Sequence, residues 1–407
     1  MSYAMIDIEL TRPLPPLRLA AEDSGVGVLL RKRGRPVGFC LVPLGTGAQL
    51  DPTELGALVA AELGEDIVRS AVEDEIASEH PHAEPLDLTV AICTRDRPEL
   101  LEVCLASILS LRETASSPFG VLVVDNAPST SATLDLVERL QGVRYVLEPR
   151  PGLDFARNRV LDEVTTALVA FVDDDAAVDH GWISGLEDAW AHDPLAVCVT
   201  GLVLPYELAT DAQVAFEGFG GFRRGFQRVR YAGLSIDRFP RYPLWAGMFG
   251  SGCNMAFRVE PLRRLGGFDE ALDTGPPLPG GGDLDVFYRV VRAGHSLVYE
   301  PRALIFHRHR KELRALRHQY WTWGTSFMAF LHKTYRSDPA MRPRVRHIAA
   351  SWLSWHVSLA TDSLRGKGPL SPELVIASVA GGVLTFPWMY PRSRRRTSRI
   401  NRRYAGS

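Results

Sequence analysis

The sequence contains little cysteine and no segment typical of secretion. Five cysteines occur among 407 residues, their number is odd, and no two of them form a CxxC pair. This pattern disfavours a disulfide framework and is typical of buried free thiols in a reducing cytosol. Residues 1–16 lack a basic segment followed by an apolar one, so we expect no secretory signal there. We therefore predict a cytoplasmic protein.

Long apolar runs and a strong net charge are also missing. No stretch of 18 or more uninterrupted apolar residues occurs, which disfavours a typical membrane-spanning helix. The formal net charge of −2 gives no reason to expect a nucleic-acid partner. A hydrophobic fraction of 46% suits a globular protein with a sizeable core. The length predicts two or three structural units.

Apolar runs and helical patterns alternate through the middle of the chain. Such alternation with short connections predicts a mostly parallel sheet covered by helices on both faces. We therefore predict an α/β domain over residues 86–310. A small α+β appendage over residues 1–85 would precede it, and a helical region over residues 311–407 would follow. The expected strands cover residues 88–93, 119–124, 143–147 and 167–172, and the expected helices cover 98–111, 131–141 and 155–163.

The appendage is predicted from two apolar runs and one helical pattern. Residues 25–30 and 36–43 flank a charged turn and read as a β-hairpin. A helix is expected after Asp51, which precedes Pro52 as a capping residue. No catalytic pattern occurs in this part, and we expect a docking or oligomerisation module.

Polar residues follow three of the expected strands. Thr94, Arg95 and Asp96 follow the first strand, Asp125 follows the second, and three aspartates follow the strand over 167–172. In parallel sheets, ligands bind beyond the carboxyl ends of the strands. We therefore expect these side chains to converge at one edge of the sheet.

The three consecutive carboxylates are Asp173, Asp174 and Asp175. Adjacent anions repel one another, and burying one without a partner is expensive. A divalent ion such as Mg²⁺ takes oxygen ligands and keeps positions open for substrate phosphates. A metal–diphosphate site is one interpretation, and a turn that caps the next helix is the other.

Three other side chains each have two interpretations. Asp125 could accept hydrogen bonds from a base or a ribose, or could be a turn residue. Arg157, one turn into a helix, could reach a diphosphate or form a surface salt bridge. His307 could bind a metal or touch a phosphate, and its basic neighbours favour contact with an anion.

Asp283 follows a Gly/Pro-rich loop over residues 275–282 that suits a lid over a bound substrate. We regard Asp283 as the candidate general base, while a helix N-cap is the alternative role. The two roles are compatible. Residues 206–245 interleave aromatic and arginine side chains, which suit sugar or phosphate contacts or, alternatively, a solvated hairpin.

These motifs, taken together and in this order, resemble those of family 2 glycosyltransferases. The motifs are Val90–Pro98, Val123–Asn126, Gly152 with Ala156–Asn158, Phe171–Asp175, Gly252–Ala256, Gly266–Asp269, Gly282–Asp285, Tyr299–Pro301 and His307. The resemblance implies the GT-A fold, which is Rossmann-like, and a nucleotide-diphosphate sugar as donor. One departure is Gly282, where the family often has glutamate. This departure weakens the acceptor assignment more than the reaction class.

The resemblance also implies roles for individual residues. Asp173 and Asp175 correspond to the DxD pair that holds Mg²⁺ or Mn²⁺, with Asp175 the more direct ligand, and His307 is assigned to the same metal. Asp283 would deprotonate an acceptor hydroxyl, giving inversion in a hexosyl or deoxyhexosyl transfer. The donor would contact Thr94, Arg95, Asp96, Asp125, Arg157, Asp174 and Asn254.

The C-terminal region combines aromatic, apolar and basic segments. Helices are expected over residues 311–332 and 351–364. Their aromatic rings could form the floor of an acceptor site or pack on the catalytic domain. Residues 374–390 are almost wholly apolar and are followed by seven arginines up to Arg403. This combination fits a peripheral contact with an anionic inner membrane face, whereas a buried helix with a solvated tail is the alternative. The acceptor could be a glycan, a lipid-linked molecule or a small molecule.

Two other functions remain open. A sugar nucleotidyltransferase would share the fold, but it usually has a Gly-rich loop after the first strand, and Thr94–Pro98 is not Gly-rich. A membrane-associated protein that binds a nucleotide sugar without turnover is the non-enzymatic alternative.

Overall fold

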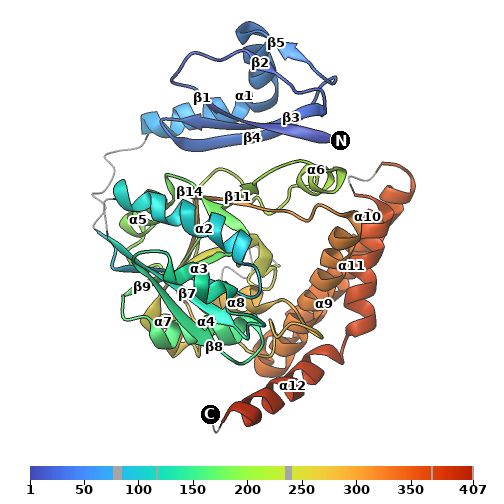
Figure 1. Ribbon diagram of the computed structural model, residues 1–407. Coiled ribbons are helices and arrows are strands. Elements are labelled where there is room, and N and C mark those ends of the chain that lie inside the picture. The colour runs from blue at the N-terminus through green and yellow to red at the C-terminus, as the bar shows by residue number, and fades with distance from the viewer. Residues whose placement is uncertain (77–84, 116–117, 234–240, 368–369, 406–407) are drawn as a thin grey trace.

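The computed structural model describes residues 1–407 except 77–84, 116–117, 234–240, 368–369 and 406–407. Figure 1 shows a small N-terminal unit above a central sheet, with the C-terminal helices along one side. The predicted α/β fold is confirmed.

The N-terminal unit is a small sheet covered by one helix. Its strands lie in the order β1 (Ser2–Glu9), β3 (Asp23–Lys32) and β4 (Arg35–Pro43), and helix α1 (Pro52–Ile76) packs on β4. The predicted hairpin is confirmed by the antiparallel pairing of β3 with β4, whereas β1 was not predicted. Asp51 caps α1, because its Oδ1 accepts hydrogen bonds from the backbone N–H groups of Thr53 and Glu54. Two short strands, β2 (Leu17–Arg18) and β5 (Gln49–Leu50), complete the unit.

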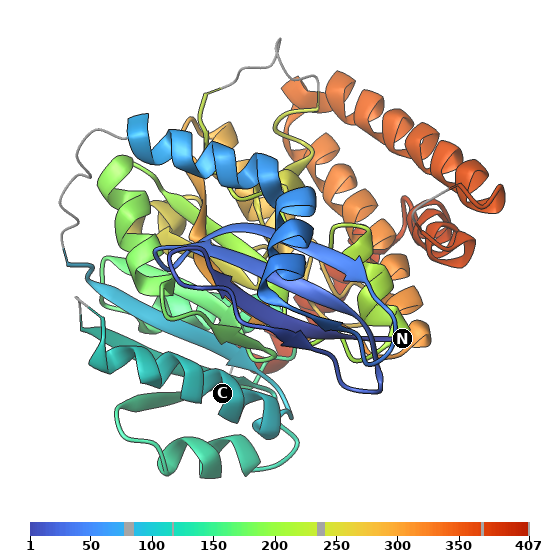
Figure 2. The ribbon, with the colours of Figure 1, turned by 90° about the horizontal axis from the view of Figure 1, so that it is seen from above.

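Apolar side chains and one buried ion pair join this unit to the central domain. Leu29 and Phe39 pack in one buried cluster with Leu204 and Leu304. Between the two parts, the Arg31 guanidinium lies 2.6 Å from the carboxylate of Asp179, and both side chains are buried. The N-terminal unit is therefore packed against the central domain, and Figure 2 shows it from above, over the central sheet.

The central sheet has the strand order β10-β14-β11-β13-β9-β6-β7-β8, with β12 paired to β14. The pairings make β6, β7, β8, β9, β11 and β14 run in one direction, and β10, β12 and β13 in the other. The bounds are β6 Leu88–Thr94, β7 Phe119–Asn126, β8 Val143–Glu148, β9 Leu168–Asp173, β10 Ala176–Val178, β11 Cys198–Pro205, β12 Val229–Tyr231, β13 Asn254–Arg258 and β14 Leu297–His307.

Residues 297–299 do not form an edge strand of the sheet. These residues belong to β14, which has β11 on one side and both β10 and β12 on the other. The partners come from distant parts of the chain, so local pattern did not reveal them. As a result, His307 lies at the end of a strand that has neighbours on both sides.

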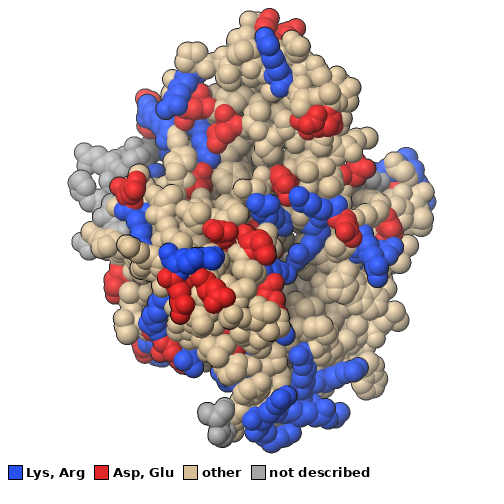
Figure 3. Space-filling view, viewed as in Figure 1, with Lys and Arg blue, Asp and Glu red and all other residues tan. Residues whose placement is uncertain are grey.

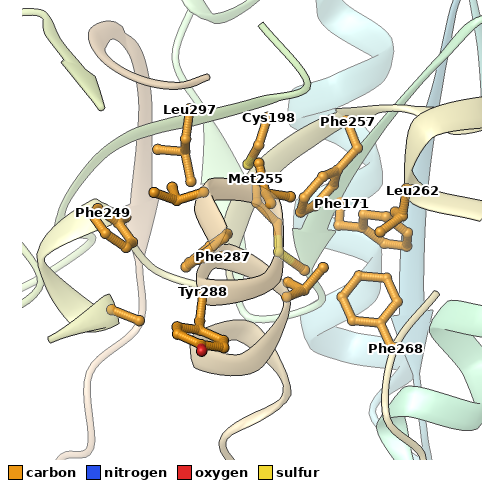
Figure 4. Packing of buried hydrophobic residues seen from close by; sticks show 14 of the residues in the cluster. Phe171, Cys198, Phe249, Met255, Phe257, Leu262, Phe268, Phe287, Tyr288 and Leu297 are labelled. Carbon is orange, nitrogen blue, oxygen red and sulfur yellow. The ribbon is translucent and has the colours of Figure 1, made fainter. Parts of the chain in front are cut away.

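Side chains alternate between two cores on the two faces of the sheet. In β6, Ala91 belongs to one buried cluster, while Val90 and Ile92 belong to the other. Figure 4 shows the first cluster, in which Phe171 meets the rings of Phe257 and Phe268 edge-on. Burial of both faces explains why these strands read as continuous apolar runs.

Helices cover both faces of this sheet. One face carries α2 (Pro98–Ser110), α3 (Ala132–Glu138) and α5 (Trp182–His192), and the other carries α4 (Leu153–Glu163), α7 (Val259–Arg264) and α8 (Gly282–Arg292). Helix α6 (Asp211–Gly218) lies beside the N-terminal unit. The expected helices at 98–111, 131–141 and 155–163 are confirmed with small shifts at their ends.

Four α-helices make up most of the described part of the C-terminal region. They are α9 (Leu313–Ser337), α10 (Arg342–Leu364), α11 (Pro372–Thr385) and α12 (Met389–Tyr404). Helices α9 and α11 approach very closely, because a Cβ on Gly381 would lie 2.1 Å from the carbonyl oxygen of Trp321. Glycine at this position therefore permits the contact.

The basic C-terminal segment is a helix, not a solvated tail. Helix α12 is fixed by hydrogen bonds to the segment 269–276, including Tyr390 Oη to Asp269 at 2.9 Å and Asn401 Nδ2 to Glu270 at 3.1 Å. Within the described residues, no single helix is long and apolar enough to cross a membrane. Helices α11 and α12 meet that length and composition together, with a bend of 68° between them.

Candidate active site

The candidate site lies where the co-directional strands of the central sheet end. Thr94 ends β6, Asp173 ends β9 and His307 ends β14. The register pairs Thr94 with Asp125 and Cys93 with Asp173. The polar residues predicted to converge therefore lie at one edge of the sheet.

Two adjoining cavities open at this edge. The smaller, about 390 Å³, is lined by Thr94, Arg95 and the three consecutive aspartates. The larger, about 740 Å³, is lined by Asp283 together with aromatic side chains of α9 and α10. Asp173 and His307 line both cavities, so they lie between the two compartments.

Asp174 is turned toward β6 and the start of α2. Its Oδ2 accepts a hydrogen bond from the Thr94 hydroxyl at 2.8 Å, and Arg97 donates to its Oδ1 at 3.1 Å. Both carboxylate oxygens therefore have partners within the protein. These contacts hold the turn that carries Asp173 and Asp175.

Asp175 pairs with His307. The Oδ1 of Asp175 lies 3.1 Å from Nε2 of His307, and its Oδ2 lies 3.5 Å from Arg97. Burial alone would raise the pKa of Asp175, but the charge and hydrogen bond of His307 bring it below its usual value. Asp175 is therefore ionised across the physiological range.

Asp173 has the opposite shift. Burial, followed by the negative charge of Asp175, raises the pKa of Asp173 to about 6. The surroundings of Asp173 therefore disfavour its ionised form, and a cation bound beside it would stabilise that form.

The donor set fits a divalent ion. Ligand atoms of Asp173, His307 and Cys253 all lie within 4.8 Å of one another, and Asp175 lies beside His307. Burial raises the pKa of the Cys253 thiol well above its usual value, and Mg²⁺ and Mn²⁺ prefer carboxylate oxygen to sulfur. Carboxylate oxygens with one imidazole nitrogen suit Mg²⁺ or Mn²⁺.

His307 is the first member of a buried chain of contacts. Its Nδ1 lies 3.3 Å from Nδ1 of His309, and Nε2 of His309 lies 2.7 Å from Oε1 of Glu217. Because an ionised carboxylate only accepts, His309 Nε2 donates to Glu217, and burial lowers the pKa of His309. The Nδ1 of neutral His309 then accepts a hydrogen bond from Nδ1 of His307. This bond orients the ring of His307 so that its Nε2 faces Asp175.

Arg157 is buried, so the surface salt bridge considered for it is wrong. Its guanidinium lies 3.0 Å from Asp154 and 3.4 Å from Asp273, and it lines the larger cavity. Burial, followed by the charge of Asp273, raises the pKa of Asp154, while burial raises the pKa of Asp273 to about 6. One arginine thus holds two carboxylates beneath the cavity.

Asp283 lies in the first turn of α8 and lines the larger cavity. The backbone N–H of Gly252 donates to its Oδ2 at 3.1 Å, and the N–H of Leu284 donates to its Oδ1 at 2.8 Å. The residue that precedes the helix is Gly281, so Asp283 is not the N-cap considered for it. The carboxylate is held by two backbone donors at the cavity wall.

Asp125 and Asp96 lie near the smaller cavity but do not line it. Asp125 is fully buried and accepts a hydrogen bond from the Tyr145 hydroxyl, while its Oδ1 has no partner among the described residues. Burial raises the pKa of Asp125. Asp96 is exposed and accepts hydrogen bonds from the backbone N–H and hydroxyl of Ser129, which joins the loops after β6 and β7.

Comparison with known proteins shows the family. The description "Glycosyl transferase family 2" matches residues 89–266. The succinoglycan biosynthesis protein ExoM of Rhizobium meliloti is 30% identical over 231 residues, which are 54% of this chain and 67% of that protein. The chain belongs to glycosyl transferase family 2.

Two further similarities accompany this family 2 assignment. The pre-mycofactocin glycosyltransferase of Mycobacterium tuberculosis is 26% identical over 307 residues, covering 72% of this chain and 60% of that protein. This chain thus matches less than two thirds of that relative. A solved mannosyltransferase, PcManGT from Pyrobaculum calidifontis in complex with GDP-Man and Mn²⁺, is 18% identical at a TM-score of 0.47, covering 85% of this chain and 90% of that chain.

Within this family 2 chain, Asn254 lies away from the two cavities. Its Nδ2 donates to the carbonyl oxygens of Leu202 and Ala303, and its Oδ1 accepts from the indole N–H of Trp182. Every polar atom of the side chain is thus bonded within the sheet and α5. The predicted donor contact of Asn254 has no support in this geometry.

Several residues of the family 2 site were missed from sequence. Arg97, Asp273 and Arg310 line the smaller cavity. Half-buried Arg224, which belongs to the segment 206–245 that was expected to suit sugar or phosphate contacts, lines the larger one. Arg97 directly follows the predicted strand-end residues, so its position was a usable signal. Asp273 lies in an irregular segment, where no periodicity marks it.

Proposed function

We infer that the chain is a metal-dependent inverting glycosyltransferase. It transfers a hexosyl or deoxyhexosyl residue from a nucleotide-diphosphate sugar to an acceptor hydroxyl. Family membership supports the reaction class, and the site supports the division of roles. The observation that carries the proposal is the shared wall of the two cavities, with Asp173 and His307 between the aspartate-rich side and Asp283.

Donor binding is assigned to the smaller cavity. Arg95, Arg97 and Arg310 supply positive charge for a diphosphate, and Thr94 fixes the turn that carries the metal-binding aspartates. The nucleoside contact assigned to Asp125 would use its Oδ1, which has no partner among the described residues. In this structure that carboxylate is buried beside the cavity and does not line it. Asp173, Asp175 and His307 would hold a divalent ion, which would supply positive charge to offset the charge that develops on the leaving diphosphate.

Asp283 is assigned as the general base. Its carboxylate takes the proton of the acceptor hydroxyl while that oxygen bonds to the anomeric carbon. The bond from the anomeric carbon to the diphosphate oxygen breaks on the opposite face, and the nucleoside diphosphate leaves. The backbone donors from Gly252 and Leu284 hold the carboxylate in place for this attack.

The acceptor is assigned to the larger cavity. Trp245, Trp323 and Trp355 line it together with Phe327, so the compartment presents flat apolar surfaces next to Asp283. Such a wall suits a sugar ring or the apolar part of a lipid-linked acceptor. We assign the chain to the cytoplasmic face of the cell membrane, where a lipid-linked acceptor would be available.

A screen of nucleotide sugars with Mg²⁺ or Mn²⁺ by thermal shift tests the donor assignment, followed by turnover with the sugar that binds. A ligand that binds only the folded state raises the melting temperature. Replacing Asp283 with asparagine should lower turnover by about 10²–10⁴-fold while donor binding is retained. Asp175→Ala should abolish the dependence of donor binding on metal.

The exposed residue Asp162 of α4 gives a matched control, and Asp162→Asn should leave turnover unchanged. Retained turnover in Asp283→Asn would overturn the base assignment. Release of pyrophosphate from a nucleoside triphosphate would instead identify a nucleotidyltransferase. Donor binding without hydrolysis or transfer to any acceptor would identify a non-catalytic binding protein.

A further inference from the structure

The junction of α11 and α12 exposes apolar side chains close together in sequence. Val383 and Leu384 are 50% and 68% exposed, and Phe386 and Trp388 are 49% and 72% exposed. Exposed apolar side chains grouped in this way are uncommon on a water-facing surface and mark interaction sites. Trp388 is the most exposed of the four, and tryptophan is enriched at membrane–water interfaces.

A basic cavity lies directly beside this apolar junction. Its volume is about 860 Å³, and Trp388 lines it together with Arg336, Arg392, Arg395, Arg396 and Arg399. The loop residues Pro276 and Pro277 form part of its wall. No carboxylate occurs in its described lining. Figure 3 shows the Lys and Arg side chains of α12 gathered at the lower end of the molecule.

These five arginines have no ion pair with any described carboxylate within 4 Å. Arg396 donates a hydrogen bond to the carbonyl oxygen of Pro276, and burial lowers the pKa of Arg396. The sequence from Leu374 to Ser407 contains seven arginines and no acidic residue, although the whole chain has a net charge of −2. The charges gathered here therefore lack an anion, and a phosphate group would supply one.

The packing of α11 favours a helix that lies on a surface over one that crosses it. One face of α11 is held against α9, where a Cβ on Gly324 would lie 1.9 Å from the carbonyl oxygen of Ser378. Helix α12 is likewise bonded to the catalytic domain through Tyr390 and Asn401. Apolar side chains on the outer face, beside a basic helix, are the pattern of an interfacial anchor.

We propose that this basic cavity binds the phosphate headgroup of an anionic phospholipid, while Val383, Leu384, Phe386 and Trp388 enter the membrane interface. The occupant is an anionic membrane surface, because the cavity joins positive charge to exposed apolar side chains. This inference rests on the proposed location at the membrane and makes it specific. It does not depend on the transfer reaction, since no catalytic residue takes part.

The test measures binding of the full chain to vesicles in the absence of any nucleotide sugar. Vesicles of phosphatidylcholine with phosphatidylglycerol are compared with phosphatidylcholine alone. The variant Arg395→Gln with Arg399→Gln removes two charges that line the cavity. The matched control, Arg402→Gln with Arg403→Gln, removes two exposed charges from the far end of the same helix.

We expect the parent chain to bind the anionic vesicles and the cavity pair to weaken binding by at least about tenfold. The control pair should weaken binding several times less. Trp388→Ser should weaken binding while leaving the melting temperature unchanged, since this side chain is 72% exposed.

Three results would overturn the proposal. Equal losses in the two arginine pairs would show a diffuse attraction without a specific cavity. Release of the parent chain from vesicles by millimolar inorganic phosphate, at constant ionic strength, would show a site for soluble phosphate. Failure of the parent chain to bind anionic vesicles would reject the membrane location itself, whatever the outcome of the turnover assays.

Discussion

At the scale of single residues, the two carboxylates of the DxD motif differ in their ionisation. Asp175 is stabilised as an anion by His307, whereas burial and the charge of Asp175 raise the pKa of Asp173 to about 6. A raised acid pKa means that the folded protein binds this proton more tightly than the unfolded chain does. In the metal-free protein, the contribution of Asp173 to the free energy of unfolding therefore falls as pH rises from about 4 to about 6.

The affinity for a divalent ion should depend on the same titration of Asp173, but it should rise as the pH rises. Below about pH 6 the ion must displace a proton from Asp173, so the affinity should fall about tenfold for each pH unit. We expect Mn²⁺ to raise the melting temperature more at about pH 7.5 than at about pH 5. Asp173→Asn should reduce this difference without removing it, because His307 must also lose a proton to bind the ion. Burial alone would lower the pKa of His307, but the charge of Asp175 raises it. An equal effect of Mn²⁺ at both pH values in the parent chain would argue against Asp173 as a ligand.

The contact chain from Glu217 through His309 to His307 leads to a second residue-scale prediction. The ring of His309 packs against Phe216, with 4.8 Å between centroids, so phenylalanine should fit in its place. His309→Phe removes the acceptor that orients His307 and should weaken binding of the divalent ion by about 10- to 100-fold.

Isothermal titration with Mn²⁺ in the absence of donor measures this effect. His318→Phe, at an exposed position of α9, is the matched control. Unchanged Mn²⁺ affinity in a folded His309→Phe variant would show that His307 needs no such support.

At the scale of elements, α9 and α11 depend on small residues for their close approach. A Cβ on Gly381 would meet the carbonyl oxygen of Trp321 at 2.1 Å, so the two helices would have to separate. Gly381→Ala should therefore lower the free energy of unfolding by about 1–3 kcal/mol, even though alanine favours helix.

Chemical denaturation followed by circular dichroism tests this expectation. The control is Gly64→Ala in α1, where a Cβ would have no neighbour within 4 Å. That substitution should be neutral or stabilising by up to about 1 kcal/mol. Equal effects of the two substitutions would mean that the contact between α9 and α11 is less tight than described.

At the scale of the whole molecule, a buried ion pair fixes the N-terminal unit to the catalytic domain. Arg31 of β3 and Asp179 of the central domain lie 2.6 Å apart with almost no exposure. Removing one member of a buried pair leaves the other charge without compensation. Arg31→Ala should thus destabilise the protein by about 3–5 kcal/mol, measured by denaturation in urea.

The exposed pair of Arg69 with Asp66 provides the comparison, because Arg69 is 46% exposed. Arg69→Ala should change the free energy of unfolding by less than about 1 kcal/mol. A small loss for Arg31→Ala would show that the apolar contact of Leu29 and Phe39 is sufficient to hold the unit.

The alternating pattern of the middle of the chain was enough to predict the sheet and the convergence of Thr94 and Asp173 at its edge. Parallel strands place their carboxyl ends together, so the placement followed from topology. The position of β14 was not predictable in this way, because its neighbours come from distant segments. Asp154 and Asp273 were missed for the same reason, since they meet at Arg157 only in the folded chain.

The helical conformation of the C-terminal arginine-rich segment was also not predictable from the sequence. Adjacent positive charges disfavour an isolated helix, and the stabilising partners of α12 lie more than a hundred residues earlier, at Asp269 and Glu270. Tertiary contacts therefore determine the conformation of this segment.

The attachment of α12 to residues 269–276 affects how shortened forms of the protein should be interpreted. The Oγ of Ser393 lies 3.1 Å from that of Thr274, and Arg396 holds Pro276, a few residues before Asp283. Deleting residues 389–407 would release the loop that leads into the catalytic helix. An inactive truncated protein would then report a loosened catalytic loop as much as a lost lipid contact, so point substitutions on the outer face of α12 are the cleaner way to separate the two.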